Sequence, residues 1–146
     1  MQTALKFPLT VFYDASCAMC ASEMHALKAR DTGGRLALVD CSAPEFKHVD
    51  AENEGVTVDA MMALVYARDA GGRWLVGVDC FEAVYRAAGL EWVARFLGVP
   101  ALRPFLDALY PWVAHHRQFL SRVGANAIVR LLMRIASRPS GPLAHP

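Results

Sequence analysis

The sequence predicts a mixed α/β domain in which a sheet is flanked by helices and a helical segment is added at the C-terminal end. Short apolar runs rich in β-branched and aromatic residues alternate with segments whose apolar residues recur every three or four positions. A Gly-Gly pair separates two of the later runs, as in an antiparallel hairpin. With 146 residues, of which 55% are hydrophobic and 20% charged, the chain is long enough for one domain that buries about two-thirds of its unfolded surface.

The first predicted unit is a strand, a helix and a second strand. The apolar run from Leu9 to Tyr13 predicts the first strand, which ends at Asp14. Four side chains then share one helical stripe, namely Cys17, Cys20, Met24 and Leu27. Gly33-Gly34 ends this helix, and residues 36–39 predict a second, buried strand. A connection of this kind suits a right-handed crossover between parallel strands.

The middle of the chain predicts two antiparallel strands. The polar segment after the second strand is expected to hold a short helix over residues 44–52. Two apolar runs, at 61–67 and 73–78, flank the dipeptide Gly71-Gly72. This pattern is typical of a hairpin with a tight turn.

A helix and then a purely helical region complete the predicted order, which is β-α-β followed by β-β-α. Asp79 is a good N-cap for the helix after the hairpin, and Gly89 ends it. We expect residues 1–98 to form the α/β domain and residues 99–138 to form a helical extension packed on it. Residues 139–146 are expected to be a disordered tail.

The predicted C-terminal helix carries a basic stripe beside a wide apolar face. The stripe recurs every four residues and comprises Arg122, Asn126, Arg130, Arg134 and Arg138. Such a helix could pack on the domain, dock to a partner subunit as in a homodimer, or lie on an anionic membrane surface. We rank these three roles in that order.

The Cys-x-x-Cys segment is the candidate site. A helix that starts near Cys17 would stabilise its thiolate, because the first amides of a helix are unpaired and its dipole is positive there. Cys20, one turn further, is placed to attack a mixed disulfide formed at Cys17. Ser16 is expected to be the N-cap, which would make Cys17 the first helical residue. Asp14 could accept a proton from Cys20 or bind the amides of the loop, and the sequence leaves both roles open.

These residues resemble a known family. The order strand, Cys-x-x-Cys helix, strand, hairpin and helix is the arrangement of the thioredoxin fold. More closely, the chain resembles the DCC family of thiol-disulfide oxidoreductases, also called DUF393, which is named for one Asp and two Cys. The matching segments are Val11-Phe12-Tyr13-Asp14-Ala15-x-Cys17-x-x-Cys20, Ala70-Gly71-Gly72-Arg73 with Gly77-Val78-Asp79, and Tyr110-x-Trp112-Val113-Ala114-x-x-Arg117.

The resemblance implies thiol-disulfide exchange of the protein-disulfide reductase type, with Cys17 as nucleophile and Cys20 as resolving thiol. It implies no cofactor beyond the redox-active Cys17–Cys20 disulfide, and a protein or small-molecule thiol or disulfide as substrate. The candidate binding residues are Tyr13, Ser16 and Met19, although Tyr13 is also a core candidate. The chain departs from most thioredoxin-fold oxidoreductases, because the expected counterpart of their cis-proline segment, residues 57–60, has no proline.

A non-catalytic binding module is the alternative function. In that case the cysteines would hold a metal or act as a redox switch, and the C-terminal helices would dock a partner. We expect no metal, because His25 follows Cys20 by five residues and lies on another face of the helix. Cys41 could approach the pair as a third thiol or ligand, but a structural role is the stronger expectation.

Other candidate groups are expected to be structural or solvated. Cys80 is predicted to be structural, and the segment His115-His116-Arg117 is predicted to be a solvated helix face.

Composition argues against several classes of partner and location. The net charge of +1 gives no reason to expect nucleic acid as a partner. The sequence has neither 18 uninterrupted apolar residues nor a signal-peptide cleavage pattern after its first apolar run. These features predict a cytoplasmic location, where a pair of cysteines is more often catalytic or metal-binding than structural.

Overall fold

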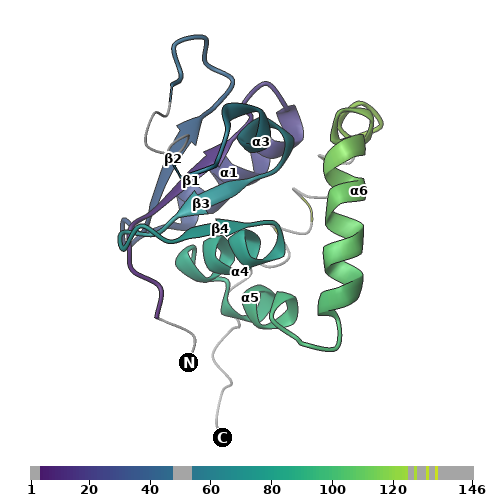
Figure 1. Ribbon diagram of the computed structural model, residues 1–146. Coiled ribbons are helices and arrows are strands. Elements are labelled where there is room, and N and C mark those ends of the chain that lie inside the picture. Colours follow the sequence, from purple (N-terminus) through teal and green to yellow (C-terminus); the bar gives the residue numbers. More distant parts are fainter. Residues whose placement is uncertain (1–3, 48–53, 125–126, 128–130, 132–133, 135–146) are drawn as a thin grey trace, which may run out of the picture.

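The strands that the structure describes form one four-stranded sheet in the order β2-β1-β3-β4 (Figure 1). The computed structural model describes residues 4–47 and 54–124, together with residues 127, 131 and 134. The elements follow in the order β1 (Leu9–Tyr13), α1 (Ala18–Arg30), β2 (Leu36–Asp40), α3 (Val58–Ala63), β3 (Tyr66–Arg68), β4 (Trp74–Val76), α4 (Val78–Ala87), α5 (Glu91–Leu97) and α6 (Arg103–Arg122). Strand β2 is parallel to β1, whereas β3 is antiparallel to both β1 and β4. The predicted mixed α/β sheet flanked by helices is therefore confirmed.

The β1-α1-β2 unit follows the prediction closely. β1 and β2 pair along their whole length, with Leu9 opposite Leu36 and Tyr13 opposite Asp40. Helix α1 ends at Arg30, and the carboxylate of its C-cap residue, Asp31, accepts a hydrogen bond from the Leu36 amide at 2.9 Å. One side chain therefore turns the chain from the helix into the second strand.

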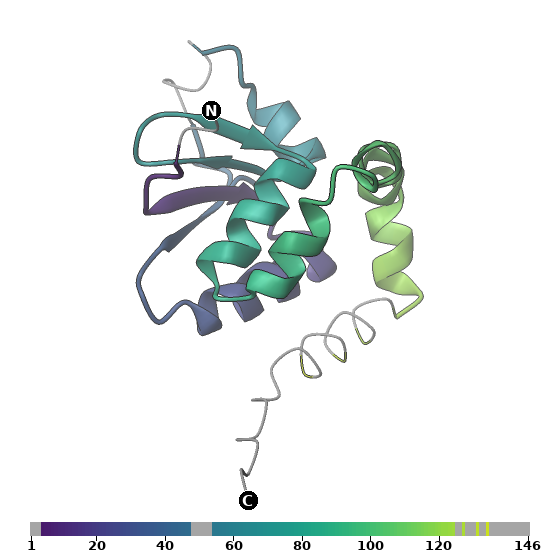
Figure 2. The ribbon, with the colours of Figure 1, turned by 90° about the horizontal axis from the view of Figure 1, so that it is seen from below.

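The core consists of two apolar clusters. Alternate residues of β1 point to opposite faces of the sheet, so Val11 belongs to the larger cluster and Phe12 to the smaller one. The larger cluster packs beneath α1 and α4, which lie on the same side of the sheet (Figure 2). Its fully buried members include Leu9, Val11, Met24, Leu27 and Val84. The smaller cluster is formed by Phe12, Cys41 and Met61, with Phe46 and Trp74 packed against it.

The prediction of the first hairpin strand is wrong in the first half of its range. Residues 61–67 were expected to be extended, but α3 covers Val58–Ala63 and β3 begins at Tyr66. The cause is an N-cap, because the Thr57 hydroxyl accepts a hydrogen bond from the Ala60 amide at 3.1 Å. A capped turn therefore replaces an extended run of the same apolar composition.

Two further local predictions are also wrong. Of the helix expected over 44–52, residues 48–52 lie outside the described residues. Residues 44–47 are not helical, because 44–45 form a turn and Phe46 packs against the smaller cluster. At the start of α4, Gly77 is the N-cap in place of Asp79. Gly77 has φ 63° and ψ −133°, a conformation that essentially only glycine adopts.

Helix α6 lies within residues 99–138, where the helical extension was expected, whereas α5 precedes that segment. Helix α6 contains Pro104 in its first turn and Pro111 inside, and it packs against α1 and α4 at one side of the molecule (Figure 1). Most of the predicted arginine stripe and all of the predicted tail, 139–146, lie outside the described residues. Within the described part of the chain, no helix combines the length and the apolar character needed to cross a membrane.

Candidate active site

The two cysteines of the motif lie where β1 gives way to α1. Cys17 is the N-cap, and α1 begins at Ala18. The prediction that Ser16 caps the helix is therefore wrong by one position, and Cys17 is not the first helical residue. The Ser16 side chain has a competing acceptor, because its hydroxyl donates to Asp14 Oδ1 at 2.5 Å and its amide donates to the same atom at 2.9 Å.

The two thiols are in direct contact. Cys20 Sγ donates to Cys17 Sγ across 3.0 Å, and both thiols are free. A disulfide needs about 2.05 Å, so an approach of about one ångström would join them. Both residues are buried, with 3% of Cys17 and 9% of Cys20 exposed. Burial raises the pKa of the Cys20 thiol, and its hydrogen bond to Cys17 raises that pKa further. Cys20 is therefore held as a protonated thiol beside Cys17.

Asp14 is fixed through both of its carboxylate oxygens. Oδ1 accepts from Ser16, and Oδ2 accepts from Arg117 Nη2 at 2.8 Å. Only 2% of the Asp14 side chain and 14% of the Arg117 side chain are exposed, so this ion pair is largely buried. Of the two roles left open for Asp14, this geometry favours the one that holds the loop. The prediction that Arg117 lies on a solvated face is wrong, because its guanidinium points into the site.

Helix α6 is attached to the segment before β3 by two side chains on one of its faces. The Tyr110 hydroxyl accepts a hydrogen bond from the Val65 amide at 2.9 Å. Seven residues later, Arg117 donates to the carbonyls of Met62 and Ala63. Sequence reasoning missed both contacts, although Tyr110 and Arg117 are the first and last residues of the third family segment quoted above. The two residues are two helical turns apart, and this spacing could have indicated that they share one face of the helix.

The segment that directly precedes β3 differs from the one expected. Residues 57–60 were predicted to occupy this position, but they form the start of α3. The chain reaches β3 through Leu64 and Val65, and Leu64 is extended at φ −133° and ψ 155°. The Val65 amide is already engaged by Tyr110. A visiting chain would therefore have to displace that hydroxyl before it could pair with this amide.

A second carboxylate, Asp40 at the end of β2, also holds the loop. Its Oδ1 accepts from the Ala15 amide at 3.2 Å and from the amide and hydroxyl of Ser42 at 2.8 and 2.6 Å. The Ser42 hydroxyl bond is the main reason why the pKa of Asp40 is lowered. Parallel pairing of β1 and β2 brings Asp40 beside the loop after β1, and sequence reasoning did not assign it to the site.

The three candidate binding residues have different surroundings. Tyr13 is buried in the larger cluster, and its hydroxyl lies 3.0 Å from His25 Nε2. Ser16 is exposed, and Met19 is half-buried on the first turn of α1. Ser16 and Met19 are therefore the two that a substrate at the loop could contact.

The remaining cysteines occupy core positions. Cys41 packs in the smaller cluster with its Sγ 4.0 Å from Met61 Sδ, and burial raises the pKa of Cys41 to about 12. Cys80 is fully buried in the larger cluster, as its predicted structural role requires. Among the residues that the structure describes, no three His, Cys, Asp or Glu side chains gather as metal ligands would.

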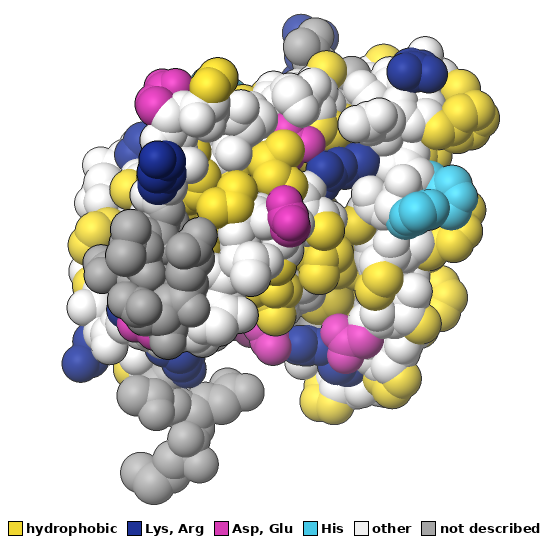
Figure 3. All heavy atoms as spheres, turned by 45° about the horizontal axis from the view of Figure 1, so that its top comes forward, with side chains coloured by type: hydrophobic (Ala, Val, Ile, Leu, Met, Phe, Trp, Pro, Cys, Tyr) yellow, Lys and Arg dark blue, Asp and Glu magenta, His cyan; other side chains and the backbone are white. Residues whose placement is uncertain are grey.

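An apolar cavity of about 250 Å³ lies between α6 and the helices beside it. It is lined by Val78, Phe81, Tyr85, Val93, Leu97, Leu106, Leu109, Tyr110, Val113 and one acid, Glu23. The acid accepts a hydrogen bond from the Tyr85 hydroxyl at 2.7 Å, and burial raises its pKa. Hydrophobic side chains line the hollow between α6 and the rest of the molecule in Figure 3. Helix α6 therefore rests on a loosely filled apolar space.

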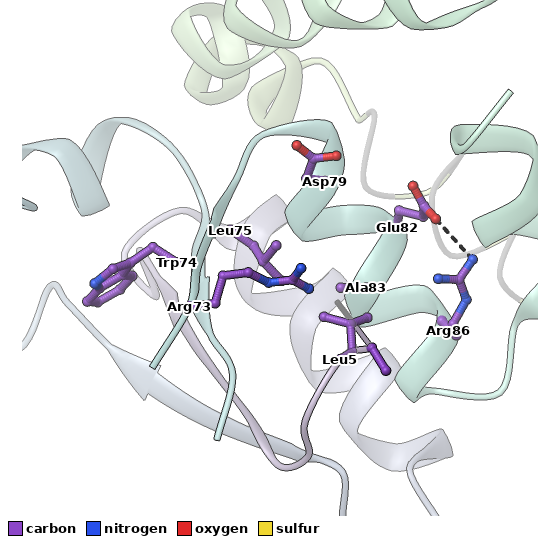
Figure 4. Close-up of a pocket in the computed structure, with 9 residues that line it drawn as sticks. Leu5, Arg73, Trp74, Leu75, Asp79, Glu82, Ala83 and Arg86 are labelled. Atoms are coloured by element: carbon purple, nitrogen blue, oxygen red, sulfur yellow. Dashed lines mark hydrogen bonds and ion pairs between the residues drawn. The ribbon is translucent and has the colours of Figure 1, made fainter. Parts of the chain in front are cut away.

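A second pocket, of about 450 Å³, is more polar and is not lined by the motif cysteines. Arg73 comes from the β3–β4 hairpin, whereas Asp79, Glu82 and Arg86 come from α4 (Figure 4). Arg86 pairs with Glu82 at 2.9 Å, and Asp79 pairs with Arg103 outside the pocket. These charges are already matched within the chain.

A mixed α/β sheet that presents a contacting pair of thiols at the start of its crossover helix defines a dithiol protein. Comparison of sequences gives the family, because residues 11–123 match the one described as DCC1-like thiol-disulfide oxidoreductase. The chain belongs to this family. The family resemblance drawn from the sequence is thus confirmed.

The chain is also similar to an uncharacterised protein of Arabidopsis thaliana that is described as chloroplastic. The two are 26% identical over 123 residues, which is 83% of this chain and 56% of the relative. The chain therefore spans little more than half the length of that relative. No solved structure matches the chain.

Proposed function

We propose that this protein is a thiol-disulfide oxidoreductase with a thioredoxin-like architecture, in which Cys17 and Cys20 are the redox-active pair. The observation that carries the proposal is the 3.0 Å contact between two free thiols at the start of α1. Membership of the DCC1-like family supports it. The order β-α-β followed by two antiparallel strands and a helix supports the architecture.

The proposed reaction transfers two electrons from the pair to a disulfide. The Cys17 thiolate attacks one sulfur of the substrate, and the other substrate sulfur leaves as a thiolate. That thiolate takes up the proton that Cys20 loses. The Cys20 sulfur then attacks Cys17 Sγ, which releases the second substrate thiolate and leaves a Cys17–Cys20 disulfide. A separate thiol system returns the pair to its reduced form, so no resident cofactor is required.

In this reaction Asp14 is a positioning residue. Both of its carboxylate oxygens already accept hydrogen bonds, Oδ1 from Ser16 and Oδ2 from Arg117. We therefore do not assign Asp14 the role of proton acceptor for Cys20. Its carboxylate fixes the loop that carries Cys17 and attaches α6 to it. The exposed Ser16 and the half-buried Met19 are the proposed substrate contacts on this loop.

Access to Cys17 requires a local opening, because only 3% of the residue is exposed. Helix α6 is the element we propose to move. It contributes no buried residue to the core, it lies over the apolar cavity, and its polar attachment beside the thiols consists of Tyr110 and Arg117. A disulfide in a protein or a small molecule would reach the pair when these contacts open.

The proposed compartment is a reducing one such as the cytoplasm. All four cysteines are free, including Cys41 and Cys80 in the core.

Reduction of insulin by dithiothreitol tests the proposal. The protein should accelerate the reaction, Cys17→Ser should abolish the acceleration, and Cys20→Ala should slow turnover, because its mixed disulfide at Cys17 is then released only by attack of dithiothreitol. Cys41→Ala is the matched control, because it removes another buried thiol from the smaller cluster. Stoichiometric zinc in the purified protein, with no acceleration by the wild type, would support the binding module in place of the enzyme.

A further inference from the structure

The outer face of α6 carries a regular apolar seam. Its members follow one another at steps of four, three, four, three and four residues, which is the spacing of one side of a two-helix coiled coil. We call this set the α6 seam: Phe105, Leu109, Trp112, His116, Phe119 and Val123. Leu109 lies at the edge of the seam, because it also lines the apolar cavity beside α6. Tyr110 and Arg117, which attach the helix to the domain, lie on the opposite side of the same helix.

The five apolar side chains of the seam are exposed, and His116 is half-buried. Phe105 is 64% exposed, Trp112 54% and Phe119 63%, and all three are large enough to belong in a core. His116 makes its own contacts within the helix, because its Nδ1 lies 2.9 Å from the Trp112 carbonyl oxygen and its ring lies 4.6 Å from the indole. Hydrophobic side chains run along the α6 side of the molecule beside the histidines in Figure 3.

We propose that the α6 seam is a dimer interface, and that its partner is the antiparallel α6 seam of a second copy of this chain. Antiparallel pairing about a two-fold axis near residue 114 sets Phe105 opposite Val123 of the other copy. It likewise sets Leu109 opposite Phe119, and Trp112 opposite His116. Each larger side chain then meets a smaller one, so the seam is complementary to itself.

Charge and area support the same arrangement. The seam contains no charged side chain, and Arg122 flanks its C-terminal end. Parallel pairing would bring two copies of Arg122 together, whereas antiparallel pairing separates them and also aligns the helix dipoles favourably. The exposed apolar side chains of one seam present on the order of 500 Å², since a full aromatic side chain buries 150–250 Å². Pairing would therefore bury about 1,000 Å² in total, which reaches the lower limit for a specific interface.

Sedimentation equilibrium of the full chain over a wide concentration range tests the dimer. The expected mass is twice that of the 16.0 kDa chain. Phe119→Glu should raise the dissociation constant by about 100-fold, because it buries an unpaired charge. The matched control is Gln118→Glu, which adds the same charge to the exposed polar side of the same helix. Circular dichroism should be unchanged in both variants, because both sites are exposed.

A charge pair tests the orientation. Phe105→Lys and Val123→Glu should each weaken the dimer, and the double variant should restore it, because antiparallel pairing brings these two positions together. A wild-type monomer at every concentration would overturn the proposal, even if it bound anionic vesicles through the seam. A dimer that survives Phe119→Glu would overturn it as well. Failure of the double variant to recover would overturn the antiparallel register. None of these outcomes depends on the thiol chemistry.

Discussion

Replacing Arg117 with alanine tests whether α6 is anchored through the Asp14 ion pair. The change leaves the Asp14 carboxylate, whose side chain is 2% exposed, without the guanidinium 2.8 Å away. It also removes the donor to the carbonyls of Met62 and Ala63. Breaking a buried ion pair by removing one partner costs about 3–5 kcal/mol. Because 14% of the Arg117 side chain is exposed, water will replace part of the interaction, and we expect a loss of about 3 kcal/mol.

Urea unfolding measures this loss of free energy of unfolding. Two further variants serve as comparisons. Arg122→Ala removes an exposed arginine from the end of the same helix and should change the free energy of unfolding by less than about 0.5 kcal/mol. Arg117→Lys keeps the charge but loses the planar fork, so it should recover only part of the loss. Faster alkylation of Cys17 in Arg117→Ala would show that the anchor also shields the thiols. Equal effects of Arg117→Ala and Arg122→Ala would refute this account of the site.

Three further substitutions test other contacts. Burial raises the pKa of Glu23, so its stabilising contribution is complete below its ordinary pKa of about 4.3 and is lost as the pH rises through the raised folded value. Glu23→Gln should therefore gain stability over wild type between pH 4 and 8 in urea unfolding, and a pH-independent difference would contradict this. Gly77→Ala should cost about 2 kcal/mol, because φ 63° with ψ −133° is a backbone conformation that essentially only glycine adopts; an unchanged melting temperature would argue against strain. Tyr110→Phe should cost about 1–2 kcal/mol by leaving the Val65 amide unpaired, and an unchanged unfolding midpoint would mean that water replaces the hydroxyl.

The parts of the fold that the sequence predicts well are those fixed by local patterns. The strand Leu9–Tyr13 and the stripe of Met24 and Leu27 each follow one period, and burial on one face enforces that period. The run at 61–67 was misassigned because its composition suits a strand or a helix, and the Thr57 cap decides for a helix. The positive φ of Gly77 has no local signature other than the glycine itself.

The part of the candidate site that is continuous in sequence was predictable. The part formed by residues from distant segments of the chain was not. Cys17 and Cys20 were identified from their spacing, and the structure brings their sulfurs into contact. Asp40 and Arg117 reach the same loop from β2 and α6, and no periodicity in either segment reports on a partner so far away. Long-range polar contacts of this kind depend on how the elements dock, which a single sequence does not encode locally.

The ion pair that anchors α6 also has a consequence for synthesis of the chain. Asp14 and Arg117 are separated by 103 residues. A ribosome completes all four strands and both cysteines of the motif well before it adds the arginine. During that interval the loop that carries Cys17 lacks the ion pair that fixes it in the finished protein. Translation of α6 is the step that supplies the second partner of this ion pair.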